Sequence, residues 1–326
     1  MKYSLESIGP IVEHATAPGQ VGLANEAAFD AAFLSQPLTQ FAVGTGGNKR
    51  EEALQKLLDF IAPSVKVPRR FEYRVANDKA DFAVEEADGD VRALYGEFKR
   101  VMAHGEVVNS KTLSKGLETV LDKDAIAEVP GLEEQKVRWL KCMLLRAEVI
   151  RAFTLLAGAA TNAAKTWSAA AGDPDNDALA AVLAGGTAKG LDPNRALYGI
   201  TAWQKRLLSL GAKNTAAGFA GFGMTPDGLA NWLGIDAAMV SRERYQTGSG
   251  KAQLTTAGTV LFFNAQDGAS PEDPSNIKRF ESPEDGGGYW AVYRREITSK
   301  LVGITVAHKS KIALTSSTGI QKLTIS

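Results

Sequence analysis

Hydrophobic and polar residues recur with different periods along the chain, and each change of period marks an expected element. Residues 49–61 repeat at helical spacing after a charged first turn. Their apolar face carries Leu54, Leu57, Leu58 and Ile61. An Ala-rich helix is predicted over residues 23–33, and residues 36–43 are predicted to form an extended apolar run that ends in glycines. Such an arm cannot bury a core by itself, so we expect it to lie along another surface.

Residues 65–121 have the alternation of extended structure. Within residues 71–75 aromatic and apolar side chains alternate with charged ones, an acidic stretch follows at residues 85–90, and residues 94–101 run back as a second extended segment. This pattern predicts a long β-hairpin. An isolated hairpin of this kind is marginal in water, so it should gain stability on another surface, and the simplest such surface is a neighbouring copy.

The longest helical pattern covers residues 132–171, after the Pro-Gly stop at residues 130–131. Its apolar positions recur at spacings of three and four: Leu145, Val149, Ala152, Leu156, Ala160, Ala163 and Trp167. At ~1.5 Å per residue, about 40 residues span roughly 60 Å, so one helix should dominate the architecture.

Basic side chains outnumber acidic ones on this long helix, which predicts a slight positive stripe on one of its faces. They are Lys136, Arg138, Lys141, Arg146, Arg151 and Lys165, against Glu133, Glu134 and Glu148. A solvated helix face explains these charges better than a nucleic-acid site does, because the excess is small.

The rest of the chain alternates between short helical and extended patterns. Turn residues at 172–177 end the long helix. Helices are predicted over residues 178–184, 201–210 and 225–233, and extended segments over residues 195–200 and 238–241. Thr225 followed by Pro226 suits the cap and first turn of its helix, and the alternation predicts a compact α/β domain.

Extended patterns dominate the C-terminal part. Strands are predicted over residues 260–263, 289–294, 301–306, 312–315 and 321–325. We expect these strands to pack against the long helix, because a sheet must bury one of its faces.

The composition is that of an ordinary globular chain. The 326 residues include 37 Lys plus Arg and 37 Asp plus Glu, so the net charge is zero, with 23% charged and 44% hydrophobic residues. This length predicts about two domains, and the neutral balance argues against a protein that coats nucleic acid by charge, while a local basic patch stays open.

The single cysteine, Cys142, and an N-terminus without the apolar run of a signal peptide favour a reducing cytoplasm. Membrane insertion is not expected, because the most apolar window, residues 143–160, contains Arg146, Glu148 and Arg151.

The glycine-rich residues 44–49 lie between an apolar run and a helix, where a phosphate-binding loop can form. A Walker loop needs a glycine directly before its lysine and Ser or Thr after it, whereas Lys49 lies between Asn48 and Arg50. A hinge between the arm and the helix is therefore the better interpretation.

No other motif carries the chemistry of an active site. The three histidines, His14, His104 and His308, do not occur at ligand spacing, and Cys142 in a helical pattern is typical of a small core residue. Acidic stretches occur at residues 85–90 and 173–177, but the second lacks the glycine and distal glutamate of a calcium loop, so a solvated turn is the better interpretation. We therefore expect no enzymatic activity, catalytic residue, cofactor or metal site.

The order of these parts, and several segments, resemble a known family. The segments are residues 71–73, 96–101, 110–112 with 115–117, 194–199 with 202–206, 242–245, 272–280, 300–302 and 320–326. Over about residues 50–326 the chain resembles the Hong Kong 97-type major capsid proteins of tailed double-stranded DNA bacteriophages.

The resemblance implies an α+β fold with an N-terminal arm, an extended hairpin loop, a long spine helix, an axial α/β domain and peripheral-domain strands. It assigns the arm and short helices to residues 1–64, the extended loop to 65–121, the peripheral domain to 122–172 and 281–326, and the axial domain to 173–280.

The resemblance also implies that many copies form pentamers and hexamers of an icosahedral shell around double-stranded DNA, in a virion assembled in the host cytoplasm. A separate scaffolding protein is expected because the arm begins within the first few residues, and a portal is expected too. Contact with DNA should be weak and non-specific, and no membrane is involved. The resemblance does not assign any of Lys99, Lys111 and Lys115 as the cross-linking lysine of some members, so no catalytic residue is carried over.

Two other interpretations stay open. An encapsulin-type compartment shares the fold and packages an enzyme instead of a genome. A soluble α/β nucleotide-binding enzyme would use residues 44–49.

Overall fold

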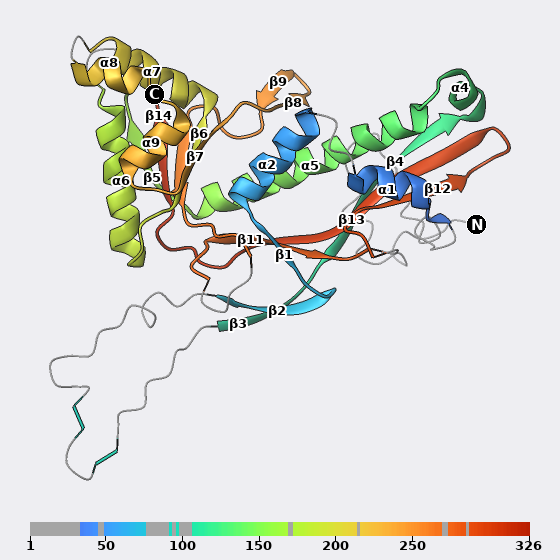
Figure 1. The fold of residues 1–326 in the computed structure, drawn as a ribbon, viewed down its shortest axis with the longest axis horizontal. Coiled ribbons are helices and arrows are strands. Elements are labelled where there is room, and N and C mark those ends of the chain that lie inside the picture. Colours follow the sequence, from blue (N-terminus) through green and yellow to red (C-terminus); the bar gives the residue numbers. More distant parts are fainter. Residues whose placement is uncertain are drawn as a thin grey trace, which may run out of the picture. The chain divides into compact units, whose positions relative to one another are not determined.

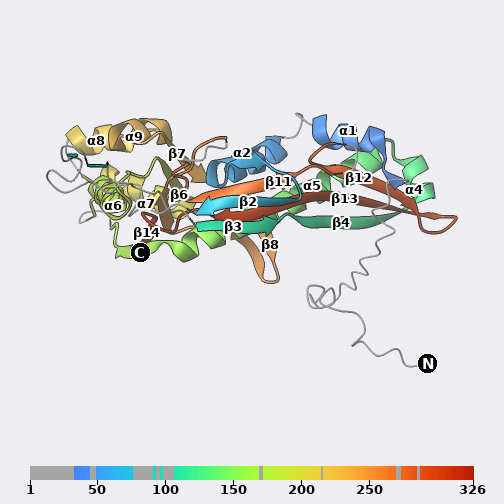
Figure 2. The ribbon, with the colours of Figure 1, turned by 90° about the horizontal axis from the view of Figure 1, so that it is seen from below.

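The computed structural model mixes helices and sheets (Figures 1 and 2). It describes residues 33–44, 49–75, 91–92, 96–97, 106–168, 172–213, 216–268, 273–284 and 287–326. The chain divides into a first unit, Met1–Thr45, Gly116–Leu140 and Glu284–His308, and a second unit, Gly46–Lys115, Lys141–Pro283 and Lys309–Ser326. The helix predicted over residues 23–33 lies outside the described residues, apart from Phe33.

The first unit is built on part of a five-stranded sheet. Its elements are α1 (Gln36–Gly44), β4 (Leu113–Asp122), α4 (Lys123–Glu128), the start of α5 (Leu132–Ala159), β12 (Ala291–Glu296) and the first half of β13 (Leu301–Leu314). β13 pairs with β12 and with β4. β4 and β13 approach closely, because a Cβ added to Gly116 would lie 3.0 Å from the carbonyl oxygen of Val306.

Helix α1 corrects the extended run predicted over residues 36–43. Leu38 and Ala42, four residues apart, are its buried positions, so the period is that of a helix. The backbone N–H of Val292 in β12 donates to Oγ1 of Thr39 at 3.0 Å, which docks the helix on the edge of the sheet. The sequence prediction failed because an apolar run of this length fits either period.

The second unit begins with helix α2 (Lys49–Ile61), which has the predicted bounds. β1 (Ser64–Lys66) runs parallel to β11 (Ile277–Ser282), and β11 pairs antiparallel with the second half of β13. β2 (Arg70–Val75) and β3 (Glu106–Lys111) form an antiparallel ribbon, which confirms residues 71–75 as a hairpin strand, but the strand that pairs with it lies at residues 106–111, after the predicted return segment. The predicted tip, residues 85–90, and most of the predicted return segment, residues 94–101, lie outside the described residues.

A second sheet follows the order β5-β14-β10-β6-β7. Its strands are β5 (Thr161–Lys165), β14 (Gln321–Ile325), β10 (Thr259–Phe263), β6 (Arg195–Gly199) and β7 (Ala237–Ser241). The accompanying helices are α6 (Pro174–Lys189), α7 (Ile200–Gly211), α8 (Ala216–Phe222) and α9 (Pro226–Leu233), and β8 (Arg244–Thr247) pairs with β9 (Gly250–Gln253) as a small hairpin. The predicted cap of α9 is confirmed, because the N–H of Gly228 donates to Oγ1 of Thr225 at 3.2 Å.

The long helix is shorter than the predicted residues 132–171. α5 ends at Ala159, and Ala163 lies in β5, which runs parallel to β14 and extends its sheet. Alanine favours a helix in isolation, but the backbone pairing offered by β14 overrides that preference. Within the described residues, no helix is long and apolar enough to cross a membrane.

Two C-terminal strand predictions also change. The strands predicted over residues 301–306 and 312–315 are one strand, β13, because its two halves find different partners, β12 and β11. The strand predicted over residues 321–325 is present as β14, but it joins the second sheet beside β10 instead of the sheet that holds β13.

Candidate assembly surfaces

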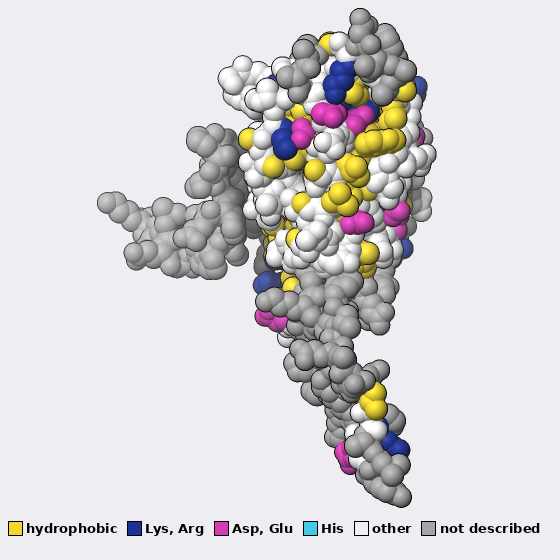
Figure 3. Space-filling view, turned by 90° about the vertical axis from the view of Figure 1, so that its left-hand side faces the viewer, with side chains coloured by type: hydrophobic (Ala, Val, Ile, Leu, Met, Phe, Trp, Pro, Cys, Tyr) yellow, Lys and Arg dark blue, Asp and Glu magenta, His cyan; other side chains and the backbone are white. Residues whose placement is uncertain are grey.

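The end of the second unit formed by α6, α8 and α9 exposes large apolar side chains. Leu183 is 57% exposed, Phe222 50% and Trp232 51%, and Figure 3 shows hydrophobic side chains in a band over this end. Leu191 and Leu208 are exposed as well. Gathered apolar side chains of this size on a surface are typical of a site that binds another protein.

A buried ion pair holds the helices behind this surface. Arg206 of α7 is fully buried, and its Nε lies 2.6 Å from Oδ1 of Asp175 in α6 while its Nη2 lies 3.0 Å from Oδ2. Its guanidinium also lies 4.9 Å from the ring centre of Trp203. A bidentate pair of this kind fixes both distance and orientation, so it sets α6 against α7.

Three aromatic side chains anchor the β2–β3 ribbon to β11, and in Figure 2 the ribbon runs along that strand. The ring centre of Phe280 lies 4.6 Å from that of Phe71 and 5.2 Å from that of Tyr73. Val65, Val67 and Ala313 complete the cluster. For this part of the hairpin, the chain itself supplies the surface that we expected from a neighbouring copy.

The opposite face of the ribbon is polar. The pleat places on it six exposed side chains: Arg70, Glu72 and Arg74 of β2 with Val107, Asn109 and Lys111 of β3. The strand register sets Arg70 directly opposite Lys111, and Glu72 opposite Asn109.

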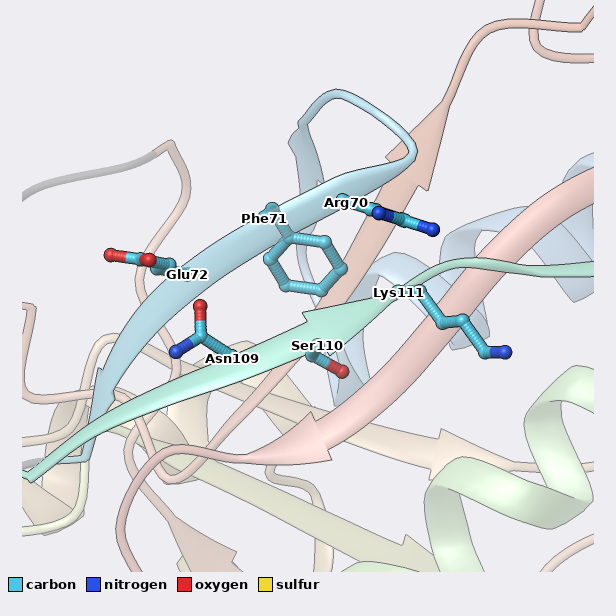
Figure 4. A pocket seen from close by; sticks show the side chains of 6 residues that line it. All are labelled: Arg70, Phe71, Glu72, Asn109, Ser110 and Lys111. Atoms are coloured by element: carbon cyan, nitrogen blue, oxygen red, sulfur yellow. The ribbon is translucent and has the colours of Figure 1, made fainter.

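A hollow of about 480 Å³ lies at this part of the ribbon, lined by three consecutive residues of each strand, 70–72 and 109–111. In Figure 4 the side chains of Arg70 and Lys111 extend to one side of the Phe71 ring, and those of Glu72 and Asn109 lie on the other side. One end of the hollow is therefore cationic.

Lys115, which follows the ribbon in β4, forms a buried ion pair with α5. Its Nζ lies 2.6 Å from Oε1 of Glu148 and 2.9 Å from Oγ of Ser310 in β13. Arg151 pairs with the same carboxylate from the more exposed side. Burial lowers the pKa of the Lys115 ammonium, and the negative charge of Glu148 opposes that shift. The pair ties the strand that leaves the ribbon to α5 and β13.

A second ion cluster joins α2 to β11. Arg279 Nη2 lies 2.7 Å from Oδ1 of Asp59, and its Nε lies 3.0 Å from Oε1 of Glu281. Burial raises the pKa of the Glu281 carboxyl, and the charge of Arg279 opposes this. This cluster and the Lys115–Glu148 pair place several charges in the interior, where each depends on its partner.

The basic side chains predicted on the long helix do not share one face. Lys141 is buried, and its Nζ lies 2.6 Å from Oε1 of the buried Glu51 in α2. Lys165 lies in β5, where it pairs with Asp177 at 2.8 Å. Lys136 is partly exposed. Carboxylates of the same chain therefore neutralise part of the positive charge that the sequence predicted for this helix.

No family model matches the sequence, and no curated protein matches it. Solved structures do match. A phage-related protein from Bordetella bronchiseptica RB50 aligns with a TM-score of 0.64 over 89% of this chain and 97% of its own, at 15% identity. The chain has the fold of phage capsid proteins.

Two further structures have the same capsid fold. A chain of Mycobacterium phage Ogopogo aligns with a TM-score of 0.53, over 82% of this chain and 91% of its own, at 12% identity. A protein of Escherichia coli CFT073, described as a prophage capsid protein, aligns with a TM-score of 0.51, over 90% of this chain and 99% of its own, at 10% identity.

Only some of the candidates for chemistry considered from the sequence lie among the described residues. Residues 45–48 of the glycine-rich loop, His14 and His104 lie outside the described residues. His308 is buried in β13, where its ring centre lies 4.5 Å from that of Trp290. Cys142 is buried as well, and burial raises its thiol pKa. In the part of the chain that the structure describes, three or more His, Cys, Asp or Glu residues do not gather as a metal site.

Sequence reasoning missed the buried ion pairs. Lys141 and Glu148 lie at helix positions between apolar residues that are themselves buried, such as Leu140 and Val149. A charge on the apolar face of a helix is a signal for a buried partner, but the partner itself comes from a distant segment and has no sequence signature.

Proposed function

We propose that this chain is a major capsid protein whose copies assemble into the icosahedral shell that encloses the double-stranded DNA genome of a tailed phage. The capsid fold, aligned over 89% of this chain and 97% of the Bordetella bronchiseptica protein, carries the proposal. The exposed apolar side chains over α6, α8 and α9 support it, because a subunit that remains alone in solution rarely exposes such a surface.

Within the shell, copies meet through heterologous contacts that close into pentamers and hexamers. The second sheet and its helices form the axial domain, which corresponds to residues 173–280 with β5 and β14 added. Residues 1–64 form the arm, residues 65–121 the extended loop, and α5 the spine helix of a peripheral domain assigned to residues 122–172 and 281–326. The apolar surface over α6, α8 and α9 then meets the same domain of neighbouring copies.

The other partners follow from the same proposal. A separate scaffolding protein and a portal take part in assembly in the host cytoplasm, and the virion is the final location. Packaged DNA makes weak, non-specific contact with the shell, because Lys141 and Lys165 already pair with carboxylates of their own chain.

Negative-stain electron microscopy with light scattering tests the proposal on protein expressed alone and together with the neighbouring genes. Closed shells or rings of five or six copies are the expected result. A strictly monomeric species under both conditions would overturn it. Shells that hold a protein cargo and no DNA would instead identify an encapsulin-type compartment.

A further inference from the structure

The small hairpin formed by β8 and β9 presents a group of exposed cations. Arg242, Arg244 and Lys251 are all exposed, and among the described residues none of the three takes part in an ion pair. Elsewhere in the second unit, cations such as Lys141 and Arg279 pair with carboxylates. In Figure 2 the hairpin, labelled β8, projects from the elements around it. The three cations are therefore open to a partner that carries negative charge.

The strand register places these cations on one face of the hairpin. Directly opposite residues of an antiparallel pair share a face, and so do alternate residues of one strand. Arg244 is opposite Gln253, and Lys251 is opposite Gln246. Arg242, two residues before Arg244, continues the row, because the backbone pairing extends one residue beyond β8 and exposed positions alternate with partly buried ones. One face of the hairpin therefore carries three cations and two amides.

The same face lacks carboxylates and apolar side chains. Glu243 is the only carboxylate within residues 242–253. It is partly buried on the other face, as are Tyr245 and Ala252, which lie opposite each other. Contacts between proteins bury aromatic and apolar side chains at their centre, so the cationic face does not have the composition of a protein interface.

We propose that this face of the β8–β9 hairpin binds the phosphate backbone of double-stranded DNA, an inference that rests on the proposed function and assigns the contact with the packaged genome to named residues. Arg and Lys side chains neutralise phosphates, and Gln side chains also donate hydrogen bonds to phosphate oxygens. Such contacts carry no sequence information, so the hairpin binds DNA of any sequence. Three cations give only weak affinity, which agrees with the neutral charge of the whole chain.

The shape of the hairpin also suits DNA. Paired strands lie about 4.8 Å apart, and the major groove of B-DNA, about 12 Å wide, admits a two-stranded ribbon. The tip consists of the small residues Gly248, Ser249 and Gly250, and a Cβ added to either glycine would have nothing within 4 Å. A slender tip of this kind lets the cations on both strands approach the phosphates that border a groove.

Removal of the three charges tests the site. Fluorescence anisotropy measures the affinity of the unassembled protein for a labelled DNA duplex of unrelated sequence. Arg242→Gln with Arg244→Gln and Lys251→Gln should weaken binding at low salt on the order of tenfold or more. Each neutralised phosphate contributes about −0.9 to the slope of log affinity against log salt concentration, so the slope should become less steep by roughly 2.7. Arg242→Lys with Arg244→Lys, which keeps the charges, should retain the wild-type slope. Unchanged affinity and slope in the triple variant would overturn the proposal.

The β2–β3 ribbon offers a matched control. Arg70→Gln with Arg74→Gln and Lys111→Gln also removes two arginines and one lysine from the exposed face of a two-stranded ribbon. We expect this variant to bind DNA close to wild type, because Glu72 shares that face and repels phosphate. An equal loss of affinity in both triple variants would show that DNA responds only to the net charge of the subunit, and would overturn the hairpin site. Thermal unfolding checks that each variant folds.

Lysine acetylation of wild-type particles gives a second test that needs no variant. Mass spectrometry compares the rate of modification in DNA-filled shells, empty shells and unassembled protein. Slower modification of Lys251 in the filled shells alone, with the exposed Lys56 of α2 little changed, would support the proposal. Equal modification of Lys251 in filled shells, empty shells and unassembled protein would overturn it. Protection of Lys251 in empty shells to the same extent as in filled ones would overturn it in favour of a contact with another protein.

The two proposals fail in different ways. Wild-type protein that forms no shell under any condition overturns the proposed function, and with it the role of the hairpin inside a shell. Wild-type shells that contain DNA, combined with unchanged DNA binding by the triple variant of the hairpin, overturn the hairpin site alone and leave the capsid function standing.

Discussion

At the scale of residues, the buried ion pairs place charges in the interior that depend on partners from distant segments. Lys115 and Glu148 lie in the interior between β4, α5 and β13, and each is costly to bury without the other. Their side chains are 15% and 2% exposed, so water compensates little for a lost partner. The pair joins the end of the ribbon to the long helix, which gives a local interaction consequences for the position of a whole element.

The first prediction concerns a variant that lacks the Glu148 carboxylate. Glu148→Gln should lower the free energy of unfolding by about 3 kcal/mol, because it leaves the Lys115 ammonium buried without its counter-charge. Urea unfolding measures the loss. Glu296→Gln, which removes the partner of Lys123 at the surface, is the control and should leave the midpoint unchanged.

The loss in Glu148→Gln should depend on pH in a defined direction. The folded-state pKa of Lys115 is already lowered by burial, and removal of Glu148 lowers it further. At pH values between this lowered pKa and the value of about 10.4 in the unfolded chain, the Lys115 amine is protonated only in the unfolded chain. The free energy of unfolding therefore rises with pH in this range. The loss of unfolding free energy in Glu148→Gln should therefore be smaller at about pH 9.5 than at pH 7. An equal loss at both pH values would show that Lys115 is not the buried partner of Glu148.

The second prediction separates two lysines of α5. Lys141→Glu should destabilise the fold by about 3–5 kcal/mol, because a new buried carboxylate would face Glu51. Lys136→Glu, at a partly exposed position of the same helix, should change stability by no more than about 0.5 kcal/mol. Chemical unfolding of both variants is the measurement. Equal effects would show that Lys141 is not buried against α2.

At the scale of elements, the ribbon is held on β11 by an aromatic cluster. β2 and β3 pair with each other, and their apolar side reaches β11 through the rings of Phe71 and Tyr73 against Phe280. A two-stranded ribbon without this contact would be marginal in water. The aromatic cluster therefore contributes to holding the base of the ribbon in place, together with the buried hydrogen bond between the hydroxyl groups of Thr112 and Ser282.

The third prediction removes one ring of that cluster. Phe71→Ala should cost about 3–4 kcal/mol locally, because it deletes a buried aromatic side chain. Hydrogen exchange of the amides in β2 and β3 should accelerate more than exchange in β6 or β10. Val107→Ala, on the outward face of the same ribbon, should leave exchange nearly unchanged. Uniform acceleration across both sheets would mean that the ribbon unfolds only with the whole molecule.

At the scale of the whole molecule, the exposed apolar surface over α6, α8 and α9 concerns association more than folding. Trp232 is half exposed in the single chain, so a polar residue at that position is tolerated before assembly. In a shell, the same side chain would be buried against another copy under the proposed function. A charge there would then be desolvated without a partner.

The fourth prediction follows. Trp232→Glu should leave the melting temperature of the unassembled protein within a few degrees of wild type and reduce assembly into rings or shells on the order of tenfold or more. Sedimentation velocity measures the distribution of species. Trp232→Phe, which keeps an aromatic anchor, should retain most of the assembly. If the Trp232→Glu variant assembled as well as the wild-type protein, this surface would not be one of the contacts between copies.

Local patterns in the sequence determined much of this protein. Lys49–Ile61 is helical as the spacing of its leucines predicted, and the cap at Thr225 begins α9 as its Thr-Pro pair predicted. The alternation at residues 71–75 correctly indicated a strand of a hairpin. These elements follow from interactions within a few residues, which a sequence pattern records directly.

Only the tertiary structure decided the features that depend on distant partners. α5 ends at Ala159 because β14, more than 150 residues away, offers β5 a parallel partner, and β14 joins the second sheet for the same reason. Residues 36–44 form a helix whose buried positions are Leu38 and Ala42, and it is held at β12 through Thr39. Glu51, Glu148 and Asp59 are the partners of buried cations, and no local pattern pairs them. Long-range pairing depends on which backbone and charged groups meet in the folded chain, and that information is distributed over the whole sequence.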